Sequence, residues 1–371
     1  MKRVVILCVW LFSVVAGHAQ LSLDECRRLA RENYPEIRQY DLVHQTEQYN
    51  LSNAARAWIP QLAFSAQATW QTDAPNFPKE LTGMLAQQGL EIPGLRKDQY
   101  KVALELNQTI WDGGKSVADK RIARAEAAEQ KTMTDVDLYE LEGRVDDLYF
   151  GILLLDERIA QTNLTLNLLR SNLEKVRALQ RNGVAMQSDA DVLEAELLSV
   201  GQQLIQFESS CDSYRRMLGI FIGQKVGDRK LQHPSAVQPL SGESARPELA
   251  MFAAKIDRLT AQEKMVKSSS MPRLGFFAQG YYGYPGLDYM QSMMNNDWSW
   301  NAMLGVKLSW NFGAYYTQKN NLNKLRTSRQ QVEVQRDVFL FNMNLQAAQE
   351  NGDIARLRKA IADDDRIVAL R

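Results

Sequence analysis

The sequence predicts a mostly α-helical fold with transmembrane β-strands, in which long antiparallel coiled-coil hairpins accompany four strands. Three observations predict it. A unit that reads helix, strand, loop, strand and long helix occurs twice along the chain. Four segments alternate apolar and polar residues, as a strand with one apolar face does. Long stretches without proline carry apolar residues at heptad spacing, which is the pattern of a coiled coil.

Residues 1–19 have the features of a secretory signal peptide. Lys2 and Arg3 precede an apolar run over 4–16, and the segment ends at the small residue Ala19. The apolar run is too short to span a bilayer as a helix. We therefore expect an exported protein.

Composition and motifs exclude several classes of function. The chain has 44 basic and 44 acidic residues, so its charge does not point to nucleic acid. Cys26 and Cys211, the two cysteines after the signal, do not make a disulfide framework, and His44 and His233 lack partners at metal-ligand spacing. There is no P-loop and no GxSxG motif. We expect no enzymatic activity, no metal site and no cofactor.

The duplication is carried by matched prolines. Pro35 corresponds to Pro247 and Pro60 to Pro272, and both pairs lie 212 residues apart. The predicted organisation is a signal peptide, a first repeat, a linker rich in Gly, Pro and Ser, and a second repeat; these cover residues 1–19, 20–223, 224–245 and 246–371.

The first repeat begins with a predicted helix from Leu23 to about Trp58, which Ser22 caps together with Glu25. Alternation over about 61–71 and 100–111 then predicts two strands, which a loop over 73–99 separates. Lys101 and Glu105 lie on the polar face of the second strand, opposite its apolar residues.

A long helix from Lys115 to Asn182 follows, with heptad-spaced apolar residues. Gly183 is expected to end it in a left-handed conformation. Ser188 and Asp189 are expected to cap a returning helix, also heptad-patterned, so the two helices form an antiparallel hairpin. The tip of this hairpin comprises Asn182, Gly183, Val184, Ser188 and Asp189.

In the second repeat, the sequence pattern predicts a helix over 246–270, strands over about 273–284 and 300–311, and a long helix from about Ala314. The last strand carries tryptophan at both ends and places Lys307 on its polar face. By the correspondence of Trp111 with Trp310, the counterpart of Gly183 falls beyond the end of the chain. We therefore expect about 50 residues of a second returning helix to be missing, and we expect the 371-residue chain alone to form poorly assembled or leaky trimers.

Each strand pair ends at a turn into its long helix. Asp112, Gly113 and Gly114 form the first turn, and Asn311 and Gly313 take part in the second, which lacks a double glycine.

This arrangement resembles the TolC family of outer-membrane efflux channels. The resemblance covers nearly all of residues 21–371, and it is carried by the segment from Leu21 to Ile37, by Ala57–Leu62, by Gln108–Gly114, and by Asn182–Val184 with Asp191–Glu196.

The resemblance implies a homotrimer in the outer membrane of a Gram-negative bacterium. Each protomer would give four strands to one lipid-embedded twelve-stranded barrel, which the helices continue as a tunnel across the periplasm. The implied function is that of a passive exit duct for substrates delivered by an inner-membrane pump through a periplasmic adaptor. The hairpin tip would meet the adaptor, and Lys101, Glu105 and Lys307 would face the lumen. Drug, metal-ion and protein export share these motifs.

The alternative is a periplasmic coiled-coil adaptor or a structural protein without a pore. Adaptors share the long hairpin, but they lack paired strands with tryptophan at the ends and this duplication.

Overall fold

The structure is a computed structural model that describes residues 20–89, 92–234 and 245–370. The predicted signal peptide lies outside these residues. Contacts group the chain into two compact units: the first takes residues 1–42 and 130–251, and the second takes residues 43–129 and 252–371. Each unit therefore draws on both sequence repeats. In the described ranges, no helix has the length and apolar character needed to cross a membrane.

The predicted single helix from Leu23 to Trp58 is wrong, because the chain breaks at Pro35. The observed elements are α2 (Leu23–Asn33), the 3-10 helix η1 (Pro35–Arg38) and α3 (Gln39–Arg56). Tyr34 before the proline is extended, as expected where the proline ring crowds the preceding residue. The predicted cap of α2 is present, since the Ser22 hydroxyl accepts the backbone N–H of Glu25 at 3.3 Å.

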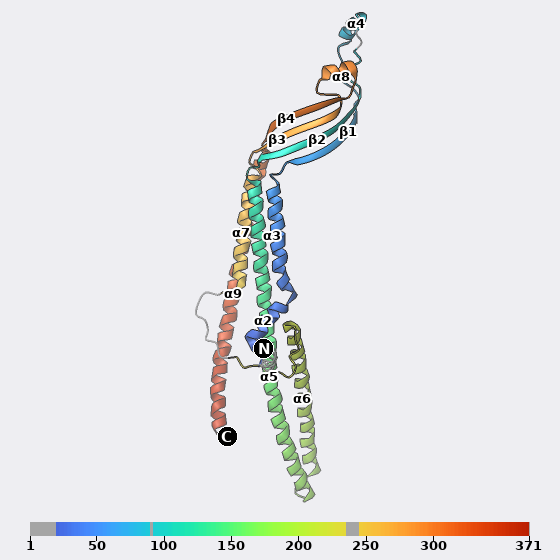
Figure 1. The fold of residues 1–371 in the computed structure, drawn as a ribbon. Helices are drawn as coiled ribbons and strands as arrows, with labels where there is room; N and C mark the ends of the chain where they lie inside the picture. Colours follow the sequence, from blue (N-terminus) through green and yellow to red (C-terminus); the bar gives the residue numbers. More distant parts are fainter. Residues whose placement is uncertain (1–19, 90–91, 235–244, 371) are drawn as a thin grey trace, which may run out of the picture. The chain divides into compact units, whose positions relative to one another are not determined.

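The long hairpin is formed by α5 (Lys115–Arg181) and α6 (Gln187–Ile222), which run side by side in Figure 1. The predicted heptad seam is buried along much of its length, as Leu138, Leu141, Val145, Ile152 and Leu166 show. Gly151 on α5 makes room for a ring on α6, since a Cβ there would lie 2.6 Å from an atom of Tyr214. The hairpin is thus held by apolar packing, at about 1.5–3 kcal/mol for each large buried side chain.

The core of the first unit gathers α2, α5, α6 and the segment that follows α6. Tyr149, fully buried on α5, directs its hydroxyl to the carbonyl oxygens of Leu21 and Gln232, at 2.7 and 2.6 Å. Leu21 also pairs with Leu231 in a parallel bridge. The start of the predicted linker therefore packs into the core, with Val226 and Leu231 buried, while residues 235–244 lie outside the described chain.

The second unit contains one antiparallel sheet in the order β1-β2-β3-β4, and its strands are β1 (Gln61–Trp70), β2 (Asp98–Trp111), β3 (Arg273–Tyr284) and β4 (Ser299–Ser309). The short helices α4 (Lys79–Gln87) and α8 (Tyr289–Asn295) lie at one end of this sheet (Figure 1). At the other end, the strands connect to α3, to the start of α5, to α7 (Pro247–Ser268) and to α9 (Gly313–Leu370).

The strand register keeps one residue parity on each face of the sheet. Phe64 faces Leu104, Leu104 faces Gly280, and Gly280 faces Ala302, so even-numbered residues share one face. Odd-numbered residues share the other face, as the row of Ala63, Glu105, Gln279 and Met303 illustrates. The sequence alternation thus becomes an apolar face and a polar face.

Helices α7 and α9 are tied to their surroundings by polar and aromatic contacts. Arg258 of α7 pairs with Glu129 of α5, and Phe252 packs against Phe339 of α9 with ring centroids 5.9 Å apart. None of the residues of α9 is buried, and its apolar stripe, which includes Val338 and Phe341, remains exposed.

Candidate functional site

The polar face of the sheet holds a chain of hydrogen bonds across β2 and β3. Lys101 Nζ donates to Gln279 Oε1 at 3.1 Å, and Gln279 Nε2 donates to Glu105 Oε1. Lys101 also lies over the ring of Tyr281, 4.5 Å from its centroid. The sequence-predicted pair Lys101 and Glu105 is therefore brought together through Gln279, which the sequence analysis did not single out.

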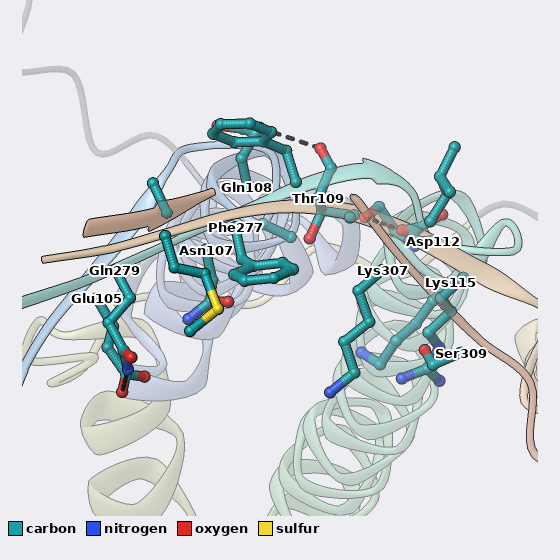
Figure 2. A pocket seen from close by; sticks show the side chains of 18 residues that line it. Glu105, Asn107, Gln108, Thr109, Asp112, Lys115, Phe277, Gln279, Lys307 and Ser309 are labelled. Carbon is teal, nitrogen blue, oxygen red and sulfur yellow. Dashed lines mark hydrogen bonds between the residues drawn. The ribbon is translucent and has the colours of Figure 1, made fainter. Parts of the chain in front are cut away.

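Lys307, the third residue predicted on this face, lies nearer the helical end of the sheet. It lines a cavity of about 580 Å³ together with Arg273, Lys115 and Ser309. Figure 2 shows Lys307 and Lys115 extending on the same side of the sheet. Lys115 is paired with Asp119 at 2.7 Å. Arg273 was missed by the sequence analysis, although the period-two alternation of β3 places it on the other face of the strand from the apolar Leu274.

Asp112 lies in the turn between the end of β2 and the start of α5. Its buried carboxylate accepts the backbone N–H groups of Gly114 and Ser116, at 2.9 and 2.7 Å, and the Ser116 hydroxyl. Burial acts to raise the pKa of Asp112, but the hydrogen bonds from Ser116 and Gly114 outweigh it, so the pKa falls below its ordinary value. The carboxylate thus satisfies donors that the first turn of a helix leaves free.

Gly113 and Gly114 are required by the shape of this turn. Both have positive φ, at 68° and 86°, and a Cβ on Gly113 would lie 2.7 Å from the Cβ of Met271. The second turn differs, because none of Asn311, Phe312 and Gly313 has a positive φ. The second turn therefore does not need a double glycine, because its residues do not adopt the left-handed backbone conformation.

Replacing Asp112 with alanine is expected to lower the free energy of unfolding by about 1–2 kcal/mol, because three hydrogen bonds to the start of α5 are lost. Circular dichroism melting of the detergent-solubilised protein measures the change. Asn311→Ala is the matched control: in the described part of the chain no donor bonds its side chain, so the expected change is within about 0.5 kcal/mol. Equal losses for both variants would contradict the capping role of Asp112.

The same carboxylate gives a pH dependence. Because its pKa lies below the ordinary value of 3.8, its stabilisation is complete above pH 3.8 and is lost as the pH falls through the folded-state value. The difference in melting temperature between wild type and Asp112→Ala should therefore stay constant near neutrality and shrink in stronger acid. A difference that grows on acidification would contradict this assignment.

The five tip residues meet at the turn of the α5–α6 hairpin. Gly183 has a φ of 76°, and Val184 N–H donates to the carbonyl of Leu179 at 2.9 Å, which closes the end of α5 as predicted. The predicted cap of α6 is half right. Asp189 accepts the N–H of Met186 at 2.9 Å, whereas Ser188 lies inside the helix rather than at its cap.

This tip exposes apolar side chains rather than burying them. Val184 is 73% exposed and Met186 74% exposed, and they are flanked by exposed polar groups. Two apolar side chains held out by a hydrogen-bonded turn are available to contact another protein surface.

The even-numbered face of the sheet is apolar and open. Phe64, Trp70, Trp300 and Leu304 are each more than 70% exposed. At the end of the sheet nearer α8, Trp298 packs against the rings of Tyr100 and Tyr282. Tyr282 also packs against Trp300, and the ring centroids of these pairs lie 5.0–5.6 Å apart. An apolar band that ends in clustered aromatic rings is typical of strands that face lipid.

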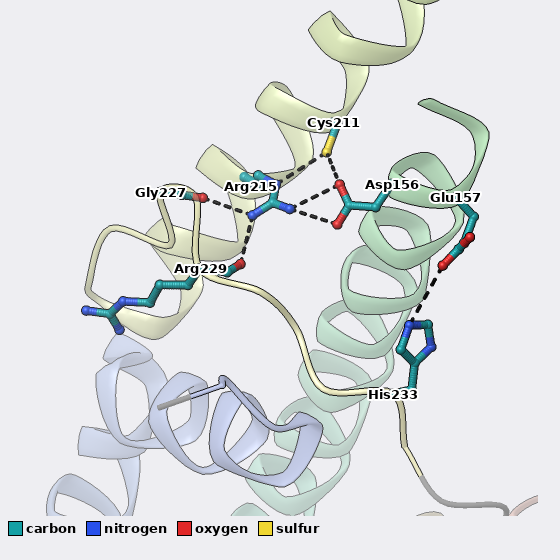
Figure 3. Close-up of polar contacts among 7 residues, drawn as sticks. All are labelled: Asp156, Glu157, Cys211, Arg215, Gly227, Arg229 and His233. Carbon is teal, nitrogen blue, oxygen red and sulfur yellow. Dashed lines mark hydrogen bonds and ion pairs between the residues drawn. The ribbon is translucent and has the colours of Figure 1, made fainter. Parts of the chain in front are cut away.

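A second polar cluster, which the sequence analysis missed, binds the segment after α6 to the hairpin (Figure 3). Arg215 of α6 donates to both carboxylate oxygens of Asp156 on α5, at 3.1 and 2.8 Å. It also donates to the carbonyls of Gly227 and Arg229, at 2.9 and 3.0 Å. No sequence motif marks these contacts, because they join residues far apart along the chain.

The two cysteines of the described chain are free thiols in this same core. Burial raises the pKa of Cys26 to about 12, and burial also raises the pKa of Cys211, against a hydrogen bond from Arg215. Both thiols are therefore protonated at neutral pH and unreactive. Within the described residues, no group of three or more His, Cys, Asp or Glu side chains is placed to hold a metal ion.

Comparison with known proteins identifies the family. Residues 27–223 match the family described as outer membrane efflux protein. No curated protein matches the sequence.

Solved outer-membrane channels share the fold. The outer membrane protein VceC from Vibrio cholerae superposes with a TM-score of 0.62 at 14% identity, over 86% of this chain and 75% of that one. The outer-membrane channel OprN gives 0.61 at 14% identity, over 86% and 71%. The CmeC outer membrane channel of Campylobacter jejuni gives 0.58 at 15% identity, over 86% and 68%.

The family match covers more than half of the chain, from α2 to the end of the α5–α6 hairpin. The resemblance expected from the sequence is thus confirmed, and the channel is favoured over the adaptor alternative. The chain belongs to the outer membrane efflux protein family and is a channel protein of the outer membrane.

Proposed function

We propose that this protein is the outer-membrane duct of a multipartite efflux assembly. Three copies form one barrel, and the helices continue it as a periplasmic tunnel. The observation that carries this proposal is the sheet, which has an exposed apolar face, a polar face and, in the described part of the chain, two edge strands that pair on one side. The duct itself supplies no energy, and an inner-membrane pump delivers the substrate.

The free edges support an oligomeric barrel. Among the residues that the structure describes, β1 and β4 each pair on one side only, so each leaves a row of backbone N–H and C=O groups without strand partners. In lipid, such groups cost several kcal/mol each unless they are paired. Pairing β4 of one copy with β1 of the next satisfies both edges, and the family resemblance favours closure with three copies. The strands, at 10 to 14 residues, are long enough to cross the hydrocarbon layer.

The two faces of the sheet support a water-filled barrel in lipid. The apolar face, with Trp70 and Trp300, turns to the acyl chains and the interface. The polar face, with Lys101, Glu105 and Lys307, then lines the lumen. An apolar substitution on the lumen side is therefore better tolerated than a charge on the lipid side.

The hairpin tip supports docking of a periplasmic adaptor. The turn comprising Asn182, Gly183, Val184, Ser188 and Asp189 is exposed and closed by its own hydrogen bonds, so it is available without unfolding. Its exposed apolar pair, Val184 and Met186, offers contact area to the tip of an adaptor hairpin.

Placing aspartate at both Val184 and Met186 is expected to abolish efflux while leaving the channel assembled, because two charges cannot be desolvated in an apolar contact. The measurement is intracellular accumulation of a panel of dyes, detergents and metal salts in a deletion strain that carries each variant. Accumulation should rise to the level of the deletion strain.

Met84→Asp is the matched control. Met84 lies on α4, between β1 and β2, and is 66% exposed. The control variant therefore replaces a similarly exposed apolar side chain with aspartate away from the tip. Its efflux should equal that of wild type. Normal efflux by the tip variant at wild-type abundance would contradict adaptor docking at this turn.

A further inference from the structure

The polar face of the sheet carries unbalanced positive charge. The charged odd-numbered residues of the four strands are Lys101, Glu105, Arg273 and Lys307. They are three cations and one carboxylate. The even-numbered face carries Asp98 alone, and Arg96 pairs with it.

Part of this charge is compensated locally. Lys101 and Glu105 are joined through Gln279, so the cation and the carboxylate offset each other along one row of hydrogen bonds. In the part of the chain that the structure describes, Arg273 and Lys307 make neither an ion pair nor a side-chain hydrogen bond. The net charge of this face therefore lies on these two exposed side chains.

The register brings the two uncompensated cations together. Arg273 faces Ser309 and Gly275 faces Lys307, so Arg273 and Lys307 are diagonal neighbours across β3 and β4. Such neighbours lie about 7–8 Å apart. Lys307 lies opposite a glycine, which leaves room for its side chain. Both line the cavity shown in Figure 2.

The carboxylates that share this cavity are already engaged. Asp112 accepts the donors at the start of α5, and Glu105 accepts from Gln279. The third cation of the cavity, Lys115, is paired with Asp119. An entering solute therefore meets two uncommitted positive groups and no uncommitted carboxylate of the cavity lining.

We propose that Arg273 and Lys307 form a basic collar that makes the channel prefer anionic solutes, those with carboxylate, sulfonate or phosphate groups. This inference rests on the proposed duct, in which three copies place six positive charges around one level of the lumen. Charge of one sign along a confined water path concentrates counter-ions. At physiological ionic strength the screening length is about 8 Å, comparable to the spacing within each pair. The Arg273 guanidinium adds the planar fork that binds such anions with two hydrogen bonds.

The test is the reversal potential of the protein, purified from outer membranes, in planar bilayers under a potassium chloride gradient at low salt. We expect wild type to favour chloride over potassium roughly three- to tenfold, and the double variant Arg273→Gln with Lys307→Gln to bring the ratio to about one. Lys307→Gln alone, a single exposed change, should give an intermediate ratio. Outer-membrane abundance verifies that each variant folds.

The matched control neutralises the compensated pair, Lys101→Gln with Glu105→Gln. It also changes two side chains of the lumen face but leaves the net charge unaltered, so the permeability ratio should not move. If wild type and the collar variants give stepwise conductance with the same chloride-to-potassium permeability ratio, the proposal of a basic collar is overturned, while the proposal of a duct stands. Outer-membrane protein that gives no stepwise conductance would overturn the duct, and the collar with it.

Discussion

Replacing Gly283 with alanine is expected to prevent assembly of the protein in the outer membrane. Gly283 of β3 faces Lys101 of β2 and Ser299 of β4. A Cβ at this position would lie 2.3 Å from the carbonyl oxygen of Tyr100 and 2.9 Å from the Cα of Lys101. Both are backbone atoms, so relief requires the strands to separate. The expected cost is about 3 kcal/mol, concentrated in the pairing of β2 with β3.

Gly280→Ala is the matched control for this prediction. Gly280 lies on the same strand, and a Cβ there would meet nothing within 4 Å. Semi-native gel electrophoresis of outer-membrane fractions compares the variants: Gly280→Ala should give the wild-type amount of assembled protein, and Gly283→Ala little or none. Equal amounts would show that the sheet does not need this close approach.

Replacing Arg215 with methionine is expected to release the segment that follows α6. The arginine side chain, 16% exposed, holds two backbone carbonyls and the carboxylate of Asp156. Methionine keeps the stem but leaves these acceptors without their donor, at a cost of about 3 kcal/mol. Hydrogen exchange of residues 223–233 should become about 100-fold faster.

Arg216→Met is the control on the adjacent residue. Arg216 pairs with Asp212 at 3.5 Å, but both side chains are 72% exposed, so the pair contributes about 0–1 kcal/mol. Exchange of residues 223–233 should change by less than about threefold. A similar acceleration in both variants would mean that Arg215 does not hold the segment.

The elements that the sequence predicts best are those with long periodic signals. The alternation of β3 and the heptads of α5 match the structure within a few residues, because each pattern is repeated over the length of its element. The turn formed by Asp112, Gly113 and Gly114 was also visible in the sequence, since glycine adopts the positive φ of this turn without strain.

Features set by tertiary contacts were not predictable in the same way. The break at Pro35 is different, because it is a local effect of the proline ring on Tyr34, and the expectation of one helix from Leu23 to Trp58 did not allow for it. The Arg215 cluster joins α5, α6 and the segment after them, and Tyr149 links two carbonyls that are far apart in the sequence. Arg273 was the exception, because strand periodicity alone placed it on the face of Lys307.

The most direct test of barrel closure by three copies is a disulfide between β1 and β4, the two edge strands. Within one chain they are separated by three strand spacings, about 14 Å, too far for a disulfide. Cysteine at Ser65 is combined in turn with cysteine at Ser299, Asn301 or Met303, after the buried Cys26 and Cys211 are replaced by serine. After oxidation in intact outer membranes, closure of one barrel by three copies predicts, for at least one pair, a covalent ladder that ends at three chains. No interchain disulfide for any pair, or a ladder that ends at two chains or continues past three, would contradict it.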